Sequence, residues 1–262
     1  MTLLKKVWQS KSPILIYQMG KVGSSALEKS IPDSVHLHDL MSISSESLIS
    51  PVRARVHKPN SQYMKRLVKR HVVPCMLKSK NKVKVISLVR EPVGRNISMY
   101  FQALPFWLSN KYLIDDSAVR EEKKNLLAET YVECLNHQYP LDWFDKEIKK
   151  LTGIDVFQTP FDSVKGSQRY QNKNFDLLVI RLDKIGESRE VIEDFVGCPI
   201  ELSKDNQASN KWYQPLIADF NSSLSLTPHY LNEMLTSKLT THFYSESEIN
   251  ALSDKYTELY VE

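Results

Sequence analysis

The sequence predicts an α/β protein in which helices cover both faces of a central parallel sheet. Short runs rich in Ile, Leu and Val recur along the chain, and stretches with helical spacing separate them. With 42% apolar and 10% aromatic residues, the chain of 262 residues can bury a substantial core. Strands that alternate with helices form a parallel sheet, because each helix returns the chain to the end from which the next strand starts.

Four apolar runs predict the strands. The first, at 13–19, is short, β-branched and closed by Gly20, which is typical of a buried strand. The second, SVHLHDL at 34–40, alternates apolar and polar residues. KVKVISLVR at 82–90 is the clearest strand of the chain, and DLLVIRLD at 176–183 is the fourth.

Helical spacing predicts the segments between the strands. Serines at the start of the first helix are available to cap it, and Pro32 ends it. A later helix follows Glu91, because Pro92 suits a first helical position. Aromatic side chains at 104–145 are expected to pack mostly in the core. The predicted helical segments are 24–31, a basic stretch at 60–72, the segment after Pro92, a charged and aromatic stretch at 117–150, and helix with loop from about 187 to the end.

Charge and cysteine content narrow the classes of partner. A net charge of +4 suits a small polyanion better than a DNA duplex, so no nucleic-acid partner is expected. Cys75, Cys134 and Cys198 stand far apart, without a C-x-x-C pair. This spacing argues against a disulfide framework and indicates a reducing compartment.

The N-terminal stretch and the apolar runs bear on localisation and domain organisation. The stretch at 1–12 has neither the long apolar core nor the cleavage site of a signal peptide. No apolar run reaches membrane-spanning length, and no clear linker interrupts the chain. We therefore expect a soluble, cytoplasmic protein with a loose leader at 1–12 and a single domain at 13–262.

A glycine loop follows the first predicted strand, in the stretch YQMGKVGSS. Gly20 and Gly23 let the backbone curl, so that its amides and the start of the next helix can face an anion, and Lys21 adds a positive charge. The loop differs from the nucleotide-binding G-x-x-x-x-G-K-[ST], because the lysine stands between the glycines. The carboxylate that would hold magnesium is also missing, since the strand at 83–89 ends in Arg90. Taken alone, the loop fits an anion site or a plain tight turn equally well.

A second polar motif lies where the third predicted strand passes into a helix. VISLVREPVGRNISMYF contains R-x-P-x-x-R-x-x-S-x-Y, and Arg90 stands at the carboxyl end of the strand, where open α/β sheets bind ligands. Arg95 and Ser98 are three residues apart on the helix and share a face. A guanidinium and a hydroxyl here suit a phosphate. The alternative is an arginine that pairs with Glu91 and a serine that faces water.

Together, the two motifs resemble those of sulfotransferases that use 3′-phosphoadenosine-5′-phosphosulfate. The resemblance implies a P-loop-like, three-layer fold of the sulfotransferase type, with the parallel sheet flanked by helices. It also implies that Arg90 and Ser98 hold the 3′-phosphate of the donor and that no metal is required. The residues that would hold the 5′-phosphosulfate are Gly20, Lys21, Val22, Gly23, Ser24 and Ser25.

Further segments resemble a bacterial group of capsular polysaccharide synthesis proteins that is named for an N-K-W-Y-S motif. The chain has Asn210, Lys211, Trp212 and Tyr213, followed by Gln214 in place of the serine. YQMGKVGSS, LDWFDKEI, LLVIRLDKI and HFYSESEI also resemble this group, so the resemblance spans nearly the whole chain. The stretch KDNQASNKWYQ at 204–214 is polar, basic and aromatic, and two hypotheses fit it equally well. In the first, it folds over the donor, with Lys211 toward phosphate and Trp212 or Tyr213 toward adenine or the acceptor. In the second, it is an ordered surface loop with a buried tryptophan.

Histidines supply the predicted general base. His36 and His38 are two residues apart on a predicted strand and share a face, and histidine can take the proton of a hydroxyl near neutral pH. The segment resembles that of some polysaccharide 2-O-sulfotransferases, which carry a similar histidine pair after the second strand and use one as base. Other carbohydrate sulfotransferases use a glutamate on the first helix, and Glu28 lies one position off that match. We predict His38 as the base, with His36 as its alternative and His57 as a weaker candidate; each could instead be a noncatalytic side chain. A metal site that adds Asp39 to the pair lacks a clear fourth ligand.

These motifs favour an enzyme that transfers a sulfuryl group to a hydroxyl of a carbohydrate or of a small hydroxylated metabolite. Lys21 would stabilise the leaving phosphate, and adenosine 3′,5′-bisphosphate would be the product. Two other functions stay open: a phosphotransferase on a degenerate nucleotide loop, and a noncatalytic polyanion-binding or assembly protein of capsule synthesis. The first function predicts binding of the bisphosphate without magnesium, whereas a phosphotransferase would bind ATP with magnesium.

Overall fold

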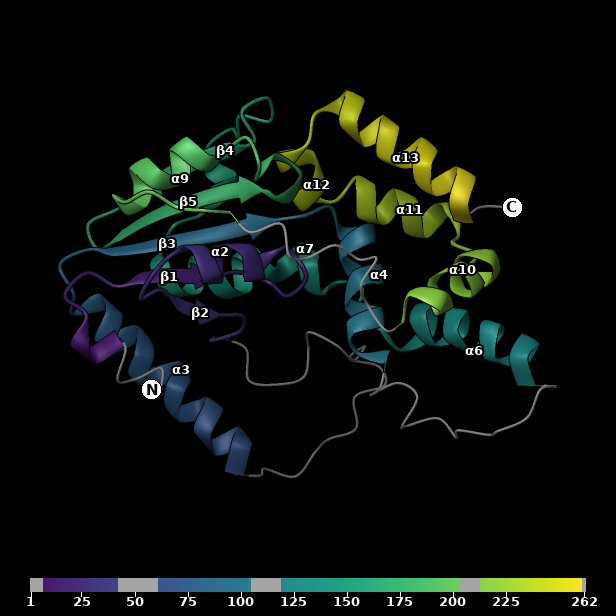
Figure 1. Ribbon diagram of the computed structural model, residues 1–262, viewed down its shortest axis with the longest axis horizontal. Helices are drawn as coiled ribbons and strands as arrows, with labels where there is room; N and C mark the ends of the chain where they lie inside the picture. The colour runs from purple at the N-terminus through teal and green to yellow at the C-terminus, as the bar shows by residue number, and fades with distance from the viewer. Residues whose placement is uncertain (1–6, 42–60, 105–118, 203–212, 261–262) are drawn as a thin grey trace. The chain divides into compact units, whose positions relative to one another are not determined.

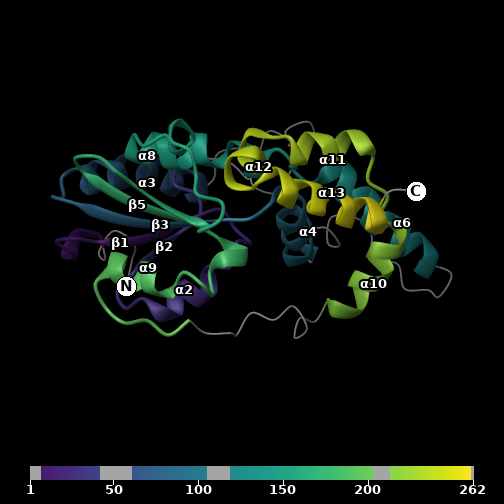
Figure 2. The same ribbon diagram turned by 90° about the horizontal axis from the view of Figure 1, so that it is seen from above.

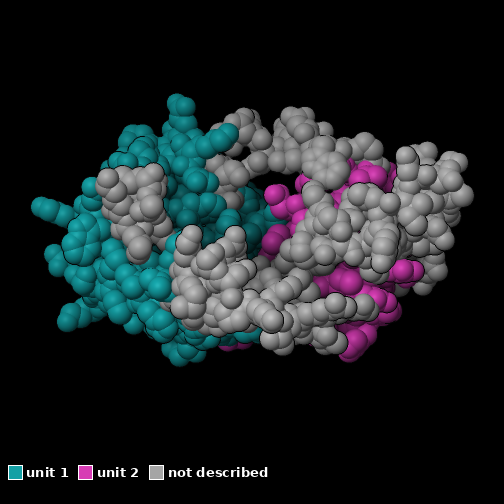
Figure 3. Space-filling view, turned by 90° about the horizontal axis from the view of Figure 1, so that it is seen from below, with its two compact units in different colours: residues 1–44, 56–90, 142–206 teal, residues 45–55, 91–141, 207–262 magenta. Residues whose placement is uncertain are grey.

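The computed structural model describes four stretches of the chain, and the chain divides into two compact units. The described stretches are residues 7–41, 61–104, 119–202 and 213–260. Unit 1 comprises residues 1–44, 56–90 and 142–206, and unit 2 comprises residues 45–55, 91–141 and 207–262 (Figure 3). Neither unit is a continuous segment, because the chain passes between them more than once. The prediction of one domain over 13–262 stays a prediction.

The described part of unit 1 is built on a sheet of five strands in the order β2-β1-β3-β5-β4 (Figure 1). The strands are β1 (Ile14–Tyr17), β2 (Val35–Leu37), β3 (Val83–Val89), β4 (Ser167–Gln171) and β5 (Phe175–Arg181). All pairings are parallel except that of β4, which runs antiparallel to β5 at the edge. Every residue of β5 is buried, as is typical of a parallel strand covered on both faces. The α/β class with a mostly parallel central sheet is therefore confirmed.

Helices cover both faces of this sheet (Figure 2). On one face lie α2 (Ser24–Ser30) and α9 (Arg189–Val196), and on the other lie α3 (Ser61–Lys78) and α8 (Lys150–Thr152). The chain order explains this placement, because β2 and β3 flank β1 on opposite sides and right-handed crossovers then put α2 and α3 on opposite faces. The remaining described elements of unit 1 are the π-helix η2 (Phe144–Lys149) and the 3₁₀ helices η3 (Val156–Gln158) and η4 (Leu182–Lys184).

The carboxyl ends of the parallel strands form one edge of the sheet. The chain leaves β1 toward β2 and later returns to β3 on the other side of β1, so the connections diverge at this edge. Open α/β sheets hold their ligands where connections diverge in this way. Gln18, His38 and Arg90 are the residues that directly follow β1, β2 and β3. The start of the glycine loop, one predicted base and one predicted phosphate ligand thus come to the same edge.

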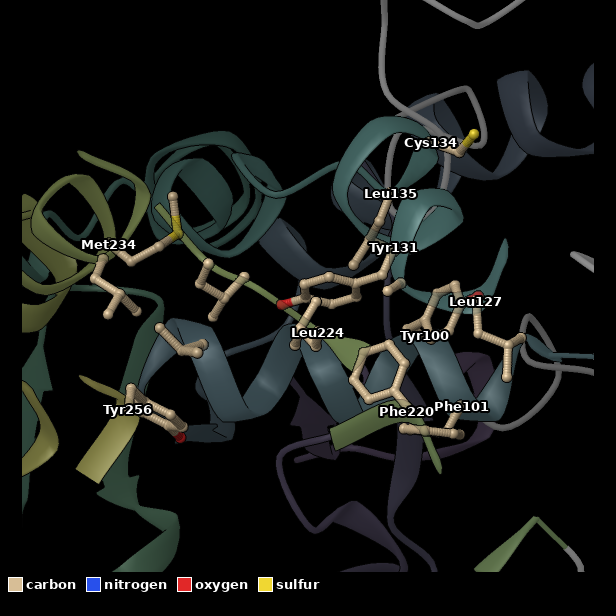
Figure 4. Packing of buried hydrophobic residues seen from close by; sticks show 14 of the residues in the cluster. Tyr100, Phe101, Leu127, Tyr131, Cys134, Leu135, Phe220, Leu224, Met234 and Tyr256 are labelled. Carbon is tan, nitrogen blue, oxygen red and sulfur yellow. The ribbon is translucent and has the colours of Figure 1, made fainter. Parts of the chain in front are cut away.

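The described part of unit 2 is helical, and its core is aromatic (Figure 4). Its helices are α4 (Pro92–Gln102), α6 (Val119–Cys134), α10 (Gln214–Ser223), α11 (Pro228–Leu235), α12 (Lys238–Phe243) and α13 (Glu246–Tyr260), and α7 (Tyr139–Trp143) begins in this unit. Tyr100 stacks on Phe220 with 5.6 Å between ring centroids, and Tyr131 meets Phe220 edge-on at 5.6 Å. The described aromatic residues of 104–145 are buried, as predicted: Tyr131 and Tyr139 in unit 2, and Trp143 and Phe144 in unit 1. Among the described residues of the chain, no helix has the length and apolar character that crossing a bilayer requires.

Several local predictions differ from the structure. β4 has the polar sequence SQRYQ, which carries no apolar signal because an edge strand need bury only part of its surface. The N-cap of α2 is Gly23, in the left-handed region, rather than a serine. α3 is longer than predicted and continues through Pro74 to Lys78. The single helical stretch predicted at 117–150 is broken, since α6 ends at Cys134 and shorter helical pieces follow.

Candidate functional site

The glycine loop after β1 has two residues with left-handed backbone. Lys21 has a φ of 72°, a conformation that few residues other than glycine adopt. Gly23 has a φ of 86°, and a Cβ added there would lie 2.4 Å from Cδ1 of Leu182. The loop therefore packs against the residue that follows β5. The left-handed backbone favours glycine at position 23, and a larger residue would also have to displace the Leu182 side chain. The side chains of Ser24 and Ser25 lie outside the described residues.

Gln18, just before the loop, ties the end of β1 to both neighbouring strands. Its side chain is buried, and its Oε1 accepts a hydrogen bond of 3.2 Å from the amide of Leu88 in β3. Its backbone N–H donates to the carbonyl of Leu37 in β2, also at 3.2 Å. Its carbonyl accepts from the ring of His38, with 3.1 Å between Nδ1 and the oxygen. The loop and the histidine pair therefore share one anchoring residue.

The two histidines lie against each other, and each ring is oriented by an acceptor. Their ring centroids are 4.4 Å apart in an edge-to-face arrangement. Nδ1 of His36 lies 3.1 Å from Oε2 of Glu28, and Nδ1 of His38 faces the Gln18 carbonyl. Carboxylate and carbonyl oxygens only accept, so Nδ1 carries the hydrogen in both neutral rings. In each ring, Nε2 then keeps the lone pair that a general base needs.

The two rings differ in access to solvent. His36 is mostly buried, and among the described residues its buried Nε2 has no hydrogen-bond partner. Burial and the neighbouring His38 lower the pKa of His36 below its usual value, although Glu28 acts in the opposite direction. His38, in contrast, is exposed. Of the two predicted bases, His38 is therefore the more accessible side chain.

Glu147 holds the chain directly after the histidine pair, and the sequence analysis did not identify it. Its buried carboxylate accepts hydrogen bonds from the amides of Leu40 and Met41, at 3.0 and 2.8 Å, and from the hydroxyl of Tyr17. Burial and the charge of Glu147 raise the pKa of Tyr17 well above its usual value, so this phenol stays a donor. The Tyr17 ring in turn packs edge-on against Trp143. An acid among aromatic residues, in LDWFDKEI, is the signal that could have pointed to it.

The second predicted motif is divided between the units. Arg90 is half-buried and is the last residue of the 56–90 segment of unit 1. Ser98 is half-buried on α4 and belongs to unit 2. Arg95 is fully buried in unit 2, where its guanidinium lies 4.6 Å from the ring centroid of Tyr139. Glu91 caps α4, accepting from the amide of Gly94 at 2.8 Å.

The later motif and the weaker candidates are only partly described. Lys211 and Trp212, as well as His57, lie outside the described residues. Tyr213 is buried in the aromatic core of unit 2, where its ring stacks on Phe101 at 5.4 Å. Burial also raises the pKa of Tyr213. The ring of Tyr213 is therefore used in core packing, and the placement of Trp212 toward adenine or the acceptor stays a prediction. Among the described residues, no group of three or more His, Cys, Asp and Glu side chains could hold a metal ion.

Comparison with known proteins gives one similarity. Residues 116–245 match the model of a family, NKWYS, that is described as "putative capsular polysaccharide synthesis protein". The match covers just under half of the chain; it includes Glu147 and the N-K-W-Y stretch but not the glycine loop or the histidine pair. Searches of curated proteins and of solved structures found no match.

Proposed function

We propose that this protein is a sulfotransferase that moves the sulfuryl group of 3′-phosphoadenosine-5′-phosphosulfate to a hydroxyl of a carbohydrate or a small hydroxylated metabolite. The observation that carries the proposal is the exposed His38, whose ring is fixed through Gln18 to the start of the glycine loop. A base and an anion-binding loop at one sheet edge suit transfer of a charged group to an alcohol. The similarity of residues 116–245 to a capsular polysaccharide synthesis family supports a carbohydrate acceptor.

The donor side rests on the glycine loop and on the arginine motif. The left-handed backbone at Lys21 and Gly23 supports a curled loop whose amides bind the 5′-phosphosulfate. The α/β sheet is compatible with the P-loop-like sulfotransferase fold that this assignment implies. The R-x-P-x-x-R-x-x-S motif assigns Arg90, at the carboxyl end of β3, and Ser98 to the 3′-phosphate. The N-K-W-Y motif assigns Lys211 to a phosphate of the donor.

The reaction is an in-line displacement at sulfur. The acceptor oxygen forms a bond to sulfur, and the bond between sulfur and the bridging oxygen of the 5′-phosphate breaks. The acceptor proton goes to Nε2 of His38, while Lys21 stabilises the negative charge that develops on the departing phosphate. The products are a sulfate ester and adenosine 3′,5′-bisphosphate.

Glu28 and His36 act as positioning residues in this proposal. Glu28 holds the His36 ring through Nδ1, and the His36 ring packs against His38. Glu28 as the base itself is less favoured, because its carboxylate is already engaged by His36.

Nucleotide binding and labelled transfer test the proposal. Calorimetry should detect binding of adenosine 3′,5′-bisphosphate without magnesium, and transfer of labelled sulfate to a panel of glycans and hydroxylated metabolites should identify the acceptor. Binding of ATP that depends on magnesium would instead support a phosphotransferase. Binding of sulfated glycans with no transfer to any acceptor would support a noncatalytic polyanion-binding protein.

The loop lysine provides a sharper variant. Lys21→Ala should lower kcat more than it lowers donor affinity, because its charge counts most when the bridging oxygen becomes negative. Exposed Lys173 on the same unit is the matched control, and Lys173→Ala should leave both constants unchanged. An unchanged kcat in Lys21→Ala would remove this lysine from the mechanism.

A further inference from the structure

The positive charge of the chain is concentrated in one segment. Residues 60–90 contain nine Lys and Arg residues and no Asp or Glu. Without this segment, acidic residues would outnumber basic ones, although the whole chain has a net charge of +4. Most of the segment is α3, which covers one face of the sheet of unit 1. A local surface of α3 therefore carries a charge that the composition of the whole chain conceals.

The outward side of α3 combines apolar residues with cations. Val68 and Val72 are 51% and 39% exposed, and Cys75 is also exposed. At about 100° per residue, these three side chains fall within about 60° of one another around the helix. Exposed Lys69 and Lys78 lie on either side of this stripe. Such an arrangement, an apolar centre between cations, is typical of helices that lie in a membrane interface.

The side of α3 opposite the apolar stripe packs onto unit 1. Among the described side chains of α3, Val73 and Leu77 are fully buried. Val68 and Val72 point away from this core and remain exposed to water. Their exposure therefore calls for an explanation other than packing within the unit.

An exposed tryptophan lies close to the residues that follow α3. Trp8 is 70% exposed, while its neighbour Val7 is buried and fixes the segment. Nζ of Lys80 donates a hydrogen bond of 3.0 Å to the carbonyl of Trp8. Half of the large apolar side chains that are exposed among the described residues are therefore found here: Trp8, Val68 and Val72. We call Trp8, Val68, Lys69, Val72, Cys75, Lys78 and Lys80 the α3 surface.

We propose that the α3 surface binds the surface of an anionic lipid bilayer. Lysines are attracted to anionic headgroups, the valines can enter the boundary between headgroups and acyl chains, and tryptophan favours that interface. A soluble polyanion would neutralise the lysines but would leave Val68, Val72 and Trp8 in water. Only a partner that is both anionic and apolar matches the whole surface. This inference does not depend on the proposed reaction.

Sedimentation of the full chain with lipid vesicles tests the inference. Binding should be strong to vesicles of equal parts phosphatidylglycerol and phosphatidylcholine and at least about tenfold weaker to phosphatidylcholine alone. At about 0.5 M salt, binding to the anionic vesicles should fall sharply, because the charge component is screened. No binding, or equal binding to both kinds of vesicle, would overturn the inference.

Matched variants locate the binding surface. The double variant Trp8→Ser with Val72→Ser, and the double variant Lys69→Gln with Lys78→Gln, should each weaken vesicle binding about tenfold. The control is Val164→Ser with Lys173→Gln, since Val164 is 86% exposed and Lys173 is exposed elsewhere on unit 1. If the control weakens binding as much, the attraction is nonspecific and the inference is wrong.

A soluble polyanion provides the last arm. Heparin binding is measured for the same variants, with thermal unfolding recorded to show that each is folded. If the Trp8 and Val72 changes leave vesicle binding intact while the lysine changes abolish heparin binding, the surface serves a soluble polyanion and the inference fails.

Discussion

The two units treat their histidines in opposite ways. In unit 2, Nε2 of His137 donates to the carbonyl of Tyr131 at 2.8 Å, and Nδ1 lies 2.9 Å from the hydroxyl of Tyr230. Both ring nitrogens of His137 are therefore used inside the aromatic core. In unit 1, the exposed His38 is fixed through Nδ1, and within the described part of the chain its Nε2 makes no hydrogen bond and keeps a lone pair.

Burial has different consequences at the two sites. Burial lowers the pKa of His137 to about 4, so this ring stays neutral and structural at neutral pH. The rings of unit 1 are oriented by Glu28 and by a backbone carbonyl, which fixes the tautomer without closing access to His38. The difference teaches that an oriented histidine with one unused, accessible nitrogen is a better candidate for catalysis than a histidine whose nitrogens are both satisfied.

Removing the exposed imidazole of His38 should have the largest effect, which is a loss of turnover. His38→Ala should lower kcat about 10² to 10⁴-fold, as expected for a lost general base, while affinity for adenosine 3′,5′-bisphosphate is kept. Stability in urea should change little, because the ring is exposed. His137→Ala is the matched control, and it should lower stability instead of kcat.

The roles of Glu28 and His36 decide whether this comparison is correct. Glu28→Gln and His36→Phe should each lower kcat less than His38→Ala does, since both residues act through the His38 ring. If Glu28→Gln abolishes turnover while His38→Ala is nearly normal, the base lies on α2 and the assignment of His38 is wrong.

Removing the buried carboxylate of Glu147 in unit 1 should have the next largest effect, which is a loss of stability. Glu147→Ala leaves the amides of Leu40 and Met41 and the hydroxyl of Tyr17 without their acceptor, which should cost about 3 kcal/mol of the free energy of unfolding. Glu147→Gln keeps a neutral acceptor and should cost about 1 kcal/mol. Urea unfolding measures both, and kcat should fall with them because this segment follows His38. Equal stability of Glu147→Ala and the parent would show that these contacts contribute nothing.

Local patterns predicted the parts of the fold that depend on neighbours in sequence. The apolar runs placed β1, β2, β3 and β5, and the two-residue spacing of His36 and His38 predicted that they share a face. What escaped prediction depends on long-range contacts: Glu147 reaches amides more than a hundred residues away, and the acid among aromatic residues in LDWFDKEI does not show which amides it binds. The polar strand β4 exists because β5 offers it a partner. The core position of Tyr213 also depends on a distant partner, because its ring stacks on Phe101.

The enclosed histidine of unit 2 should produce a pH effect of intermediate size. In the unfolded chain, His137 takes up a proton below about pH 6.5, whereas in the folded protein it does so only near its pKa of about 4. The unfolded state therefore binds more protons between these values, and the free energy of unfolding should fall by about 2 kcal/mol as the pH drops from 6.5 to 4.

Urea titrations at a series of pH values measure this slope. His36 contributes in the same direction, because its pKa is also lowered. The diagnostic quantity is therefore the difference between the parent and His137→Gln, which should have a flatter profile. Parallel profiles would mean that His137 is not the enclosed group that the comparison requires.

The N-caps of α11 in unit 2 and α2 in unit 1 also differ, and removing the cap of α11 should have the smallest effect on stability. In unit 2, Thr227 is the N-cap of α11, and its Oγ1 accepts a hydrogen bond of 3.1 Å from the backbone amide of Tyr230. In unit 1, the N-cap of α2 is Gly23, which has no side chain to accept such a bond. Thr227→Ala removes this acceptor and should cost about 1 kcal/mol of the free energy of unfolding, with kcat unchanged. Thr227→Ser keeps the hydroxyl and should restore most of the loss. If serine destabilises as much as alanine does, the threonine methyl group packs against its neighbours and the cap is not what α11 depends on.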